Sequence, residues 1–212
     1  MMPKPLLLAM CATLLIGGVA HAQSANPYPR PVPAKTTTPQ GSTMDDLKRF
    51  ATDGMSILES KNGDLTGNGG KDVLLVLDPP AAPNAKLGEG AGRRVAVLVR
   101  DASGQLHEAA SNDRIVPCAT CGGMAGDPFG YTRIAPGQFT IVNGGGSRER
   151  WSDEYTFTYA PDKKDWFVSH VVRRVDDTET GAHKAVDLTA KELGSTTFKA
   201  FDPSHLPEAT LP

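Results

Sequence analysis

The chain has 212 residues, and its 22 basic and 24 acidic side chains give a formal net charge of −2 at pH 7. So balanced a charge gives no electrostatic reason to expect capture of nucleic acid or of an anionic membrane surface. The length is sufficient for one domain with a hydrophobic core of its own.

The first residues have the pattern of a secretory signal peptide. Lys4 forms a short basic region, residues 6–19 are mainly apolar, and Ala20 and Ala22 place small side chains where a signal peptidase cleaves. The apolar stretch is shorter than the roughly 20 residues that a membrane-spanning helix needs. We therefore expect residues 1–22 to be removed by cleavage after Ala22, and the mature protein to be periplasmic or secreted. No later segment has the length or apolar character of a membrane span.

The remaining chain divides into a linker, a domain and a tail. Residues 23–41 hold five prolines and three consecutive threonines with almost nothing apolar. Such a segment cannot bury enough surface to offset the entropy of ordering it, so we expect a disordered linker. A single β-rich domain is expected over residues 42–206, followed by a flexible tail at 207–212.

The domain is expected to begin with a short helix. Ser42 and Thr43 are suitable capping residues, Leu47 and Phe50 recur at helical spacing, and Gly54 ends the pattern.

The rest of the domain has the pattern of antiparallel β structure. Residues 73–77 and 95–99 are continuous apolar runs, as expected of strands buried on both faces. In residues 155–159 aromatic side chains alternate with threonines, which predicts one buried and one solvated face. Gly- and Pro-containing turns separate these segments, so the fold class expected is mainly β, a single antiparallel domain. Further strands are expected at 106–110, 131–134, 138–143 and 166–174, with a helical turn at 189–193 and a last strand at 197–201.

One loop has the residue spacing of a calcium site. Calcium binds six to eight oxygen atoms, and loops supply them at alternate positions around a sharp glycine turn. Asp64, Thr66, Asn68 and Asp72 occupy positions 1, 3, 5 and 9, with the carbonyl of Gly70 at position 7. This stretch and the apolar run after it resemble the calcium loop of FG-GAP/VCBS repeats. The resemblance implies a bound Ca²⁺ that fixes the loop; the alternative is a Gly/Asn-rich turn that binds no metal.

A second motif is the pair Cys118 and Cys121. An even pair of cysteines in an oxidising compartment predicts a disulfide. A thioredoxin-like redox centre needs its first cysteine at a helix N-terminus, and the glycines and proline at 122–128 disfavour a helix there. A zinc site needs two more ligands at a suitable spacing. We therefore predict a structural disulfide, with a redox centre and a metal site as the alternatives.

No residue is assigned a catalytic role. The chain has no Gly-x-Ser-x-Gly motif, and Ser147 lies in a glycine-rich connection without a base nearby in the sequence. Arg148, Arg150 and Trp151 suit either a small basic and aromatic recognition patch or a solvated turn beside a core tryptophan. We favour the solvated turn.

Several motifs together are similar to those of uncharacterised periplasmic proteins of Gram-negative bacteria. They are the Asp-rich turn, Cys-x-x-Cys-Gly-Gly with Gly-Asp-Pro-Phe, and Gly-Gly-Ser-Arg-x-Arg-Trp with Tyr-x-Phe-x-Tyr, spread over residues 60–202. The resemblance implies the compartment and the disulfide loop, but no activity.

We expect a non-enzymatic exported domain that binds an envelope partner, either a protein or a glycan. Loops on a rigid scaffold are the usual place for recognition, so residues 118–129 and 144–151 are the expected binding surface. The alternative is an envelope enzyme, either a thiol redox protein or a hydrolase that uses His107 or His170.

Overall fold

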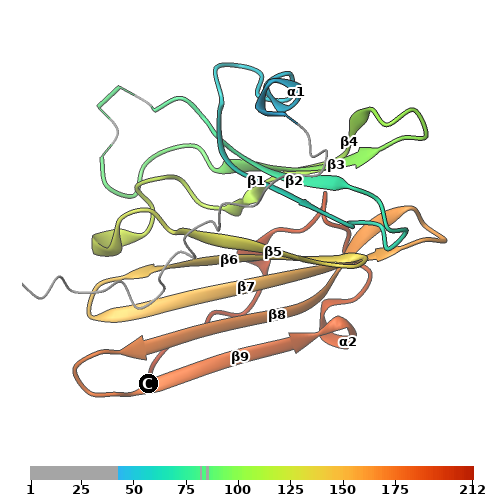
Figure 1. Ribbon diagram of the computed structural model, residues 1–212. Helices are drawn as coiled ribbons and strands as arrows, with labels where there is room; N and C mark the ends of the chain where they lie inside the picture. The colour runs from blue at the N-terminus through green and yellow to red at the C-terminus, as the bar shows by residue number, and fades with distance from the viewer. Residues whose placement is uncertain (1–42, 82, 85) are drawn as a thin grey trace, which may run out of the picture.

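The computed structural model describes residues 43–81, 83–84 and 86–212. The predicted signal peptide and linker lie outside the described residues. Within them the chain is mainly β, and its strands form two antiparallel sheets (Figure 1). The helices are α1 (Met44–Lys48) and α2 (Ala190–Leu193), and the strands are β1 (Ser56–Gly63), β2 (Asp72–Asp78), β3 (Arg93–Arg100), β4 (Leu106–Val116), β5 (Phe129–Ala135), β6 (Gln138–Gly146), β7 (Glu149–Ala160), β8 (Asp165–Asp177) and β9 (His183–Thr189).

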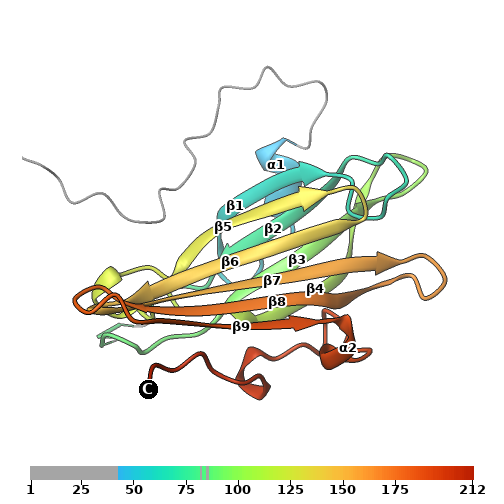
Figure 2. The same ribbon diagram turned by 90° about the horizontal axis from the view of Figure 1, so that it is seen from below.

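Both sheets are simple meanders. The first sheet has the order β1-β2-β3-β4 and the second the order β5-β6-β7-β8-β9, so every neighbour in a sheet is also the neighbour in sequence. The sheets lie face to face as a sandwich, with α1 on the outer side of the first sheet (Figures 1 and 2). The predicted fold class, a single antiparallel β domain with a short N-terminal helix, is confirmed.

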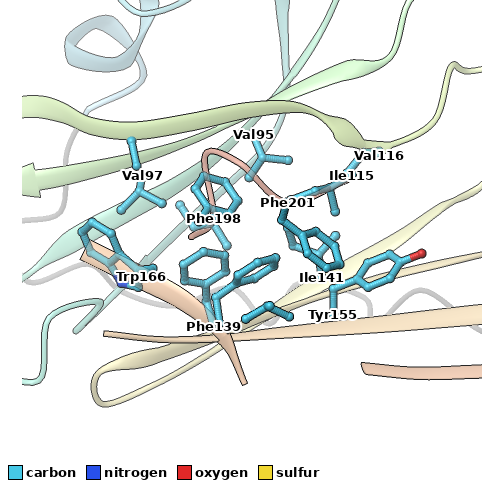
Figure 3. Close-up of a cluster of buried hydrophobic side chains, with 14 of the residues drawn as sticks. Val95, Val97, Ile115, Val116, Phe139, Ile141, Tyr155, Trp166, Phe198 and Phe201 are labelled. Carbon is cyan, nitrogen blue, oxygen red and sulfur yellow. The ribbon is translucent and has the colours of Figure 1, made fainter. Parts of the chain in front are cut away.

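The main core fills the space between the two sheets. Valines of β2 and β3 meet aromatic side chains of β6, β7 and β8, and Phe139, Phe157 and Phe198 pack ring against ring with centroids 5.1–5.3 Å apart. Phe198 and Phe201 belong to the C-terminal segment, which enters between the sheets (Figure 3). Because neither residue belongs to a strand, that segment completes the core as an irregular wedge.

The central strands of the first sheet, β2 and β3, are buried on both faces, as their continuous apolar runs predicted. Residues 73–77 are fully buried; alternate side chains face the second sheet, and the others contact Leu47 of α1. Thr43 caps α1 with a capping box, in which its hydroxyl accepts from the Asp46 N–H and the Asp46 carboxylate accepts from the Thr43 N–H. Among the described residues no helix is both long and apolar enough to cross a membrane.

The predicted last strand at 197–201 is wrong. Only one isolated bridge forms there, between Phe167 and Thr197. The segment is held instead by Asn112, whose side-chain amide donates to the carbonyls of Phe198 and Phe201 at 2.6 and 2.8 Å. A buried amide that satisfies two carbonyls removes the need for a strand ladder.

Candidate functional site

The predicted calcium loop connects β1 to β2 at one end of the sandwich. One oxygen of the Asp64 carboxylate accepts hydrogen bonds from the backbone N–H groups of Gly67 and Asn68 at 2.7 and 3.0 Å, and the other accepts from Gly69 at 2.9 Å. The side-chain oxygen of Asn68 accepts from the N–H of Gly70 at 2.7 Å. The exposed half of the loop is therefore held by its own side-chain oxygens.

The buried half of the loop is organised by Asp72. Its carboxylate accepts from the N–H groups of Leu65 and Arg100, both at 3.1 Å, and from the Thr66 hydroxyl at 3.4 Å. These bonds account for the shape of the loop without a metal ion. No group of three or more His, Cys, Asp and Glu side chains able to hold a metal is found within the described residues. Calcium binding by this loop stays a prediction.

The same loop closes its end of the sandwich. Leu65 is fully buried, and its carbonyl accepts the indole N–H of Trp166 from the second sheet at 2.8 Å. The carbonyl of Asp64 accepts the N–H of Gly137, in the turn between β5 and β6, at 2.9 Å. The loop thus ties the two sheets together.

Cys118 and Cys121 form the predicted disulfide, with an S–S distance of 2.10 Å. The residues that follow pack on the end of β6. The N–H of Gly146 donates to the carbonyl of Gly122 at 2.9 Å, and the N–H of Gly144 donates to that of Pro128 at 2.8 Å. The two segments expected to carry recognition therefore lie side by side.

The segment 144–151, expected to be a loop, is largely strand. β6 continues to Gly146 and β7 begins at Glu149, so only two residues form the turn. A Cβ on Gly145 would lie 2.7 Å from the carbonyl oxygen of Gly122 and 2.8 Å from Cζ2 of Trp151. Glycine is needed there because the disulfide loop and the indole ring approach the same point of the strand.

Arg93 fixes the disulfide loop to the first sheet. Its buried guanidinium donates to Asp78 at 2.7 Å and to both oxygens of Asp127 at 2.5 and 2.8 Å. Burial by itself lowers the pKa of Arg93, but the carboxylates of Asp127 and Asp78 outweigh that effect and raise the pKa above its usual value. The guanidinium therefore stays charged and holds the loop in place.

At this end of the sandwich, the inward-facing positions of the second sheet change from apolar to polar. Tyr155 and Phe157 of β7 face the core, and Asp153, two residues earlier, faces the same way because side chains in a strand alternate. Asn143 of β6 and Arg173 of β8 pair with Asp153 in register. Three neighbouring strands thus place polar side chains in one inward-facing row.

These polar side chains form a largely buried network. The Nε and Nη2 atoms of Arg173 donate to the two oxygens of Asp153 at 3.0 and 3.2 Å, and the Tyr155 hydroxyl donates to Asp153 at 2.8 Å. Burial and, second, the negative charge of Asp153 raise the pKa of Tyr155 well above its usual value, so the phenol remains protonated. Figure 3 shows the ring of Tyr155 in the core with its hydroxyl directed away from the cluster.

A cleft of about 520 Å³ opens over this network. Its floor is the inner face of the second sheet, one wall is the end of β4 at Arg114 and Ile115, and another is the segment 203–209. The tail predicted to be flexible begins in this wall, where the carbonyl of Pro207 accepts from Nη1 of Arg173 at 3.3 Å. The volume lies within the range of small-molecule sites.

The side chains of Asn143 and Trp151 each present to the cleft a polar group without a partner in the described part of the chain. The amide nitrogen of Asn143 donates to the carbonyl of Ile115 at 2.8 Å, but its Oδ1 is buried and accepts no hydrogen bond. The indole N–H of Trp151, which also lines the cleft, donates to no described protein atom. A buried acceptor left without a donor costs about 1–3 kcal/mol, so the cleft gains from any group that supplies one.

The histidines considered for a hydrolase lie elsewhere. His170 pairs with Asp187 at 2.7 Å on an exposed part of β8 and β9, and His107 is exposed on β4. Neither is among the residues that line the cleft. The cleft therefore does not combine a histidine with its carboxylates.

Sequence reasoning assigned no role to Asp153, Asn143 or Arg173. The available signal was the alternation that runs from Trp151 through Asp153 to Tyr155, which puts an aspartate at an inward position. Trp151, expected to flank a solvated turn, instead lines the cleft on the same inward face.

No protein-family model, curated protein or solved structure matches this chain.

Proposed function

We propose that this protein is an exported, non-enzymatic binding module of the cell envelope, whose cleft between the sheets holds a small ligand. The observation that carries the proposal is the inward-facing polar row of Asn143, Asp153 and Arg173 beneath an open cavity of about 520 Å³. Core positions of a sandwich normally carry apolar side chains, and departures from that rule are concentrated at functional sites.

Stability alone is a poor reason for these residues. A buried ion pair contributes little net stability, because desolvation of both charges offsets their attraction. The unpaired Oδ1 of Asn143 is unfavourable in the free protein. Groups that do not stabilise the empty fold are best accounted for by a bound state that uses them.

The surroundings support binding because they hold the cleft in one shape. The disulfide loop is fastened to Arg93 on the first sheet and to the glycines of β6 on the second. Asn143, Asp153 and Arg173 themselves project from paired strands. Preorganised side chains on rigid elements lose little entropy when a ligand binds.

The two tryptophans give a direct test with a built-in control. Trp151 lines the cleft with a free indole N–H, whereas the indole of Trp166 is buried against the Leu65 carbonyl. A ¹H–¹⁵N spectrum of the exported protein shows one indole signal from each, assigned with Trp151→Phe. Titration with a library of small polar and aromatic fragments is expected to shift the Trp151 signal while the Trp166 signal stays in place. A folded protein in which no fragment shifts the Trp151 signal would overturn the proposal.

Export is tested separately by sequencing the N-terminus of the protein recovered from the periplasm or the medium. Cleavage after Ala22 predicts a mature chain that starts at Gln23. Recovery of a chain that still starts at Met1, confined to the cytoplasm, would contradict it.

A further inference from the structure

The chemistry of the cleft indicates which class of ligand fits it. We infer that the ligand is an uncharged saccharide, with one sugar ring stacked on the indole of Trp151. This inference rests on the proposed function, since it takes the cleft to be a binding site. Charge, aromatic surface and unpaired polar groups each contribute to it.

The charges of the cleft are balanced, and each of its arginines already has a partner. Its lining has three arginines and three carboxylates. Arg173 is paired with Asp153, Arg174 donates to Glu154 at 2.9 Å, and Arg114 donates to the carbonyl of Lys199 at 2.6 Å. Each arginine of the lining thus already has a partner, so an anionic ligand would compete with an existing contact.

The unpaired groups fit a ligand that both donates and accepts hydrogen bonds. The buried Oδ1 of Asn143 lacks a donor. The indole N–H of the partly buried Trp151 donates to no described protein atom, so it is available to donate to a ligand. A hydroxyl is both, so a polyhydroxylated ligand satisfies the two groups with one kind of substituent. An apolar ligand of the same size would leave the buried oxygen without a partner, which sites of this kind reject strongly.

The remaining lining suits the apolar face of a sugar ring. Trp151 offers a large flat surface with a polar edge, and Ile115, Pro117, Val175 and Pro203 add apolar contacts around it. The Asp153–Arg173 pair also lines the cleft, where it can bind ring hydroxyls. A mixed lining of this kind binds a ligand whose faces are apolar and whose rim is polar.

The test uses defined sugars as probes and reads the Trp151 indole signal. Uncharged probes are N-acetylglucosamine, its β-1,4-linked disaccharide, maltose and trehalose, and charged comparisons are glucuronic acid and glucosamine. We expect at least one uncharged probe to shift the Trp151 signal in a saturable way and to bind about tenfold or more tightly than its charged counterparts.

Variants assign the contacts. Trp151→Ala is expected to weaken binding about tenfold or more, as loss of an aromatic anchor does. Trp151→Phe keeps an aromatic ring and removes the N–H, so a smaller loss of affinity is expected. Because this variant lacks the indole signal, its affinity is measured from the chemical shifts of the neighbouring backbone amides. Asn143→Leu is expected to weaken binding several-fold. His170→Ala, on the outer surface, serves as the matched control and should leave the affinity unchanged.

The possible failures are distinguishable. If sugars leave the Trp151 signal unmoved while other fragments shift it, the cleft is a binding site and the saccharide inference is wrong. If charged probes bind better than uncharged ones, the inference is also wrong. If no probe of any class shifts the signal in the folded protein, the proposed function falls with it.

Discussion

At one end of the sandwich Leu65 is fully buried and Asp72 accepts three hydrogen bonds, whereas at the other end Asn143 keeps an unpaired oxygen beneath an open cleft. Both ends contain a buried carboxylate and a tryptophan. At the first end both groups bind the backbone of Leu65 and hold the two sheets together. At the second end they face a cavity. The same residue types therefore close the sandwich at one end and line an open cavity at the other.

The difference follows from what covers the inner face of the second sheet. The loop between β1 and β2 folds inward over Trp166, so that end is capped by backbone from the first sheet. At the other end β4 stops at Val116, and the chain leaves through Pro117 into the disulfide loop. The C-terminal segment then forms a wall beside the inner face, and the cleft stays open between them. One end is thus expected to determine stability and the other binding.

The largest expected effect comes from the sealed end. Leu65→Ala removes a fully buried side chain and should lower the free energy of unfolding by about 3 kcal/mol, measured by urea denaturation. Leu87→Ala is the matched control, because Leu87 is 63% exposed, and its effect should stay within about 0.5 kcal/mol. A loss below about 1 kcal/mol for Leu65→Ala would show that this loop does not seal the core.

The second prediction compares a single with a double substitution in the cleft. Asp153→Ala leaves the buried guanidinium of Arg173 unpaired and should destabilise the protein by about 2 kcal/mol. This is less than for a fully buried pair, because the two side chains are 10% and 17% exposed. Replacing both, Asp153→Leu with Arg173→Met, should restore stability to within about 1 kcal/mol of the natural protein. The double variant is nevertheless expected to lose ligand binding.

Chemical denaturation and the Trp151 indole titration separate these effects. A double variant that is as unstable as Asp153→Ala would mean that the ion pair is structural, like the network around Asp72. A double variant that still binds the ligand would show that the ion pair takes no part in binding.

The fold was largely predictable because its strands carry strong local patterns. A few residues of sequence are enough to predict β2 and β3 from their apolar runs and β7 from its alternating aromatic side chains. β1 and β9 were missed because they are edge strands with few buried side chains, and edges tolerate polar and charged residues. The segment 197–201 was assigned as a strand, because its apolar residues are those of a strand, while its actual anchor, Asn112, lies far away in sequence.

The cleft was not predictable to the same degree, because it depends on register across strands. Asn143, Asp153 and Arg173 come together only when β6, β7 and β8 pair with the observed alignment, which includes a bulge between Thr156 and Phe157. A shift of one residue would turn all three to the outside. The disulfide and the calcium-type loop, by contrast, are local motifs that can be seen without any register.

The third prediction uses the phenol that joins the core to the cleft. Burial raises the pKa of Tyr155 above its value in the unfolded chain, near 10. A raised pKa in the folded state gives stability that is complete below pH 10 and is lost as the pH rises further. Above pH 10 the natural protein should lose up to about 1.4 kcal/mol per pH unit through this group.

Tyr155→Phe isolates that contribution. At pH 7 the variant should be about 1 kcal/mol less stable, because the hydrogen bond to Asp153 is lost. Between pH 10 and 11 its stability should fall less steeply than that of the natural protein, as followed by urea denaturation at each pH. Equal slopes would mean that the hydroxyl is solvated and that the cleft reaches further into the core.

The smallest expected effect concerns calcium at the sealed end, and it bears on why that end is closed. If Asp64, Thr66, Asn68, Gly70 and Asp72 bind Ca²⁺ weakly, with a Kd near 1 mM, calcium at about 5 mM should stabilise the fold by about 1 kcal/mol over EDTA. That corresponds to a rise in Tm of roughly 2–4 °C.

Asp64→Ala should abolish the rise, while Asp176→Ala, away from the loop, should leave it intact. No rise in the natural protein would show that backbone amides alone satisfy the loop carboxylates, because the hydrogen bonds from Gly67, Asn68 and Gly69 already occupy both oxygens of Asp64. The end opposite the cleft would then be closed by hydrogen bonds and a buried leucine alone.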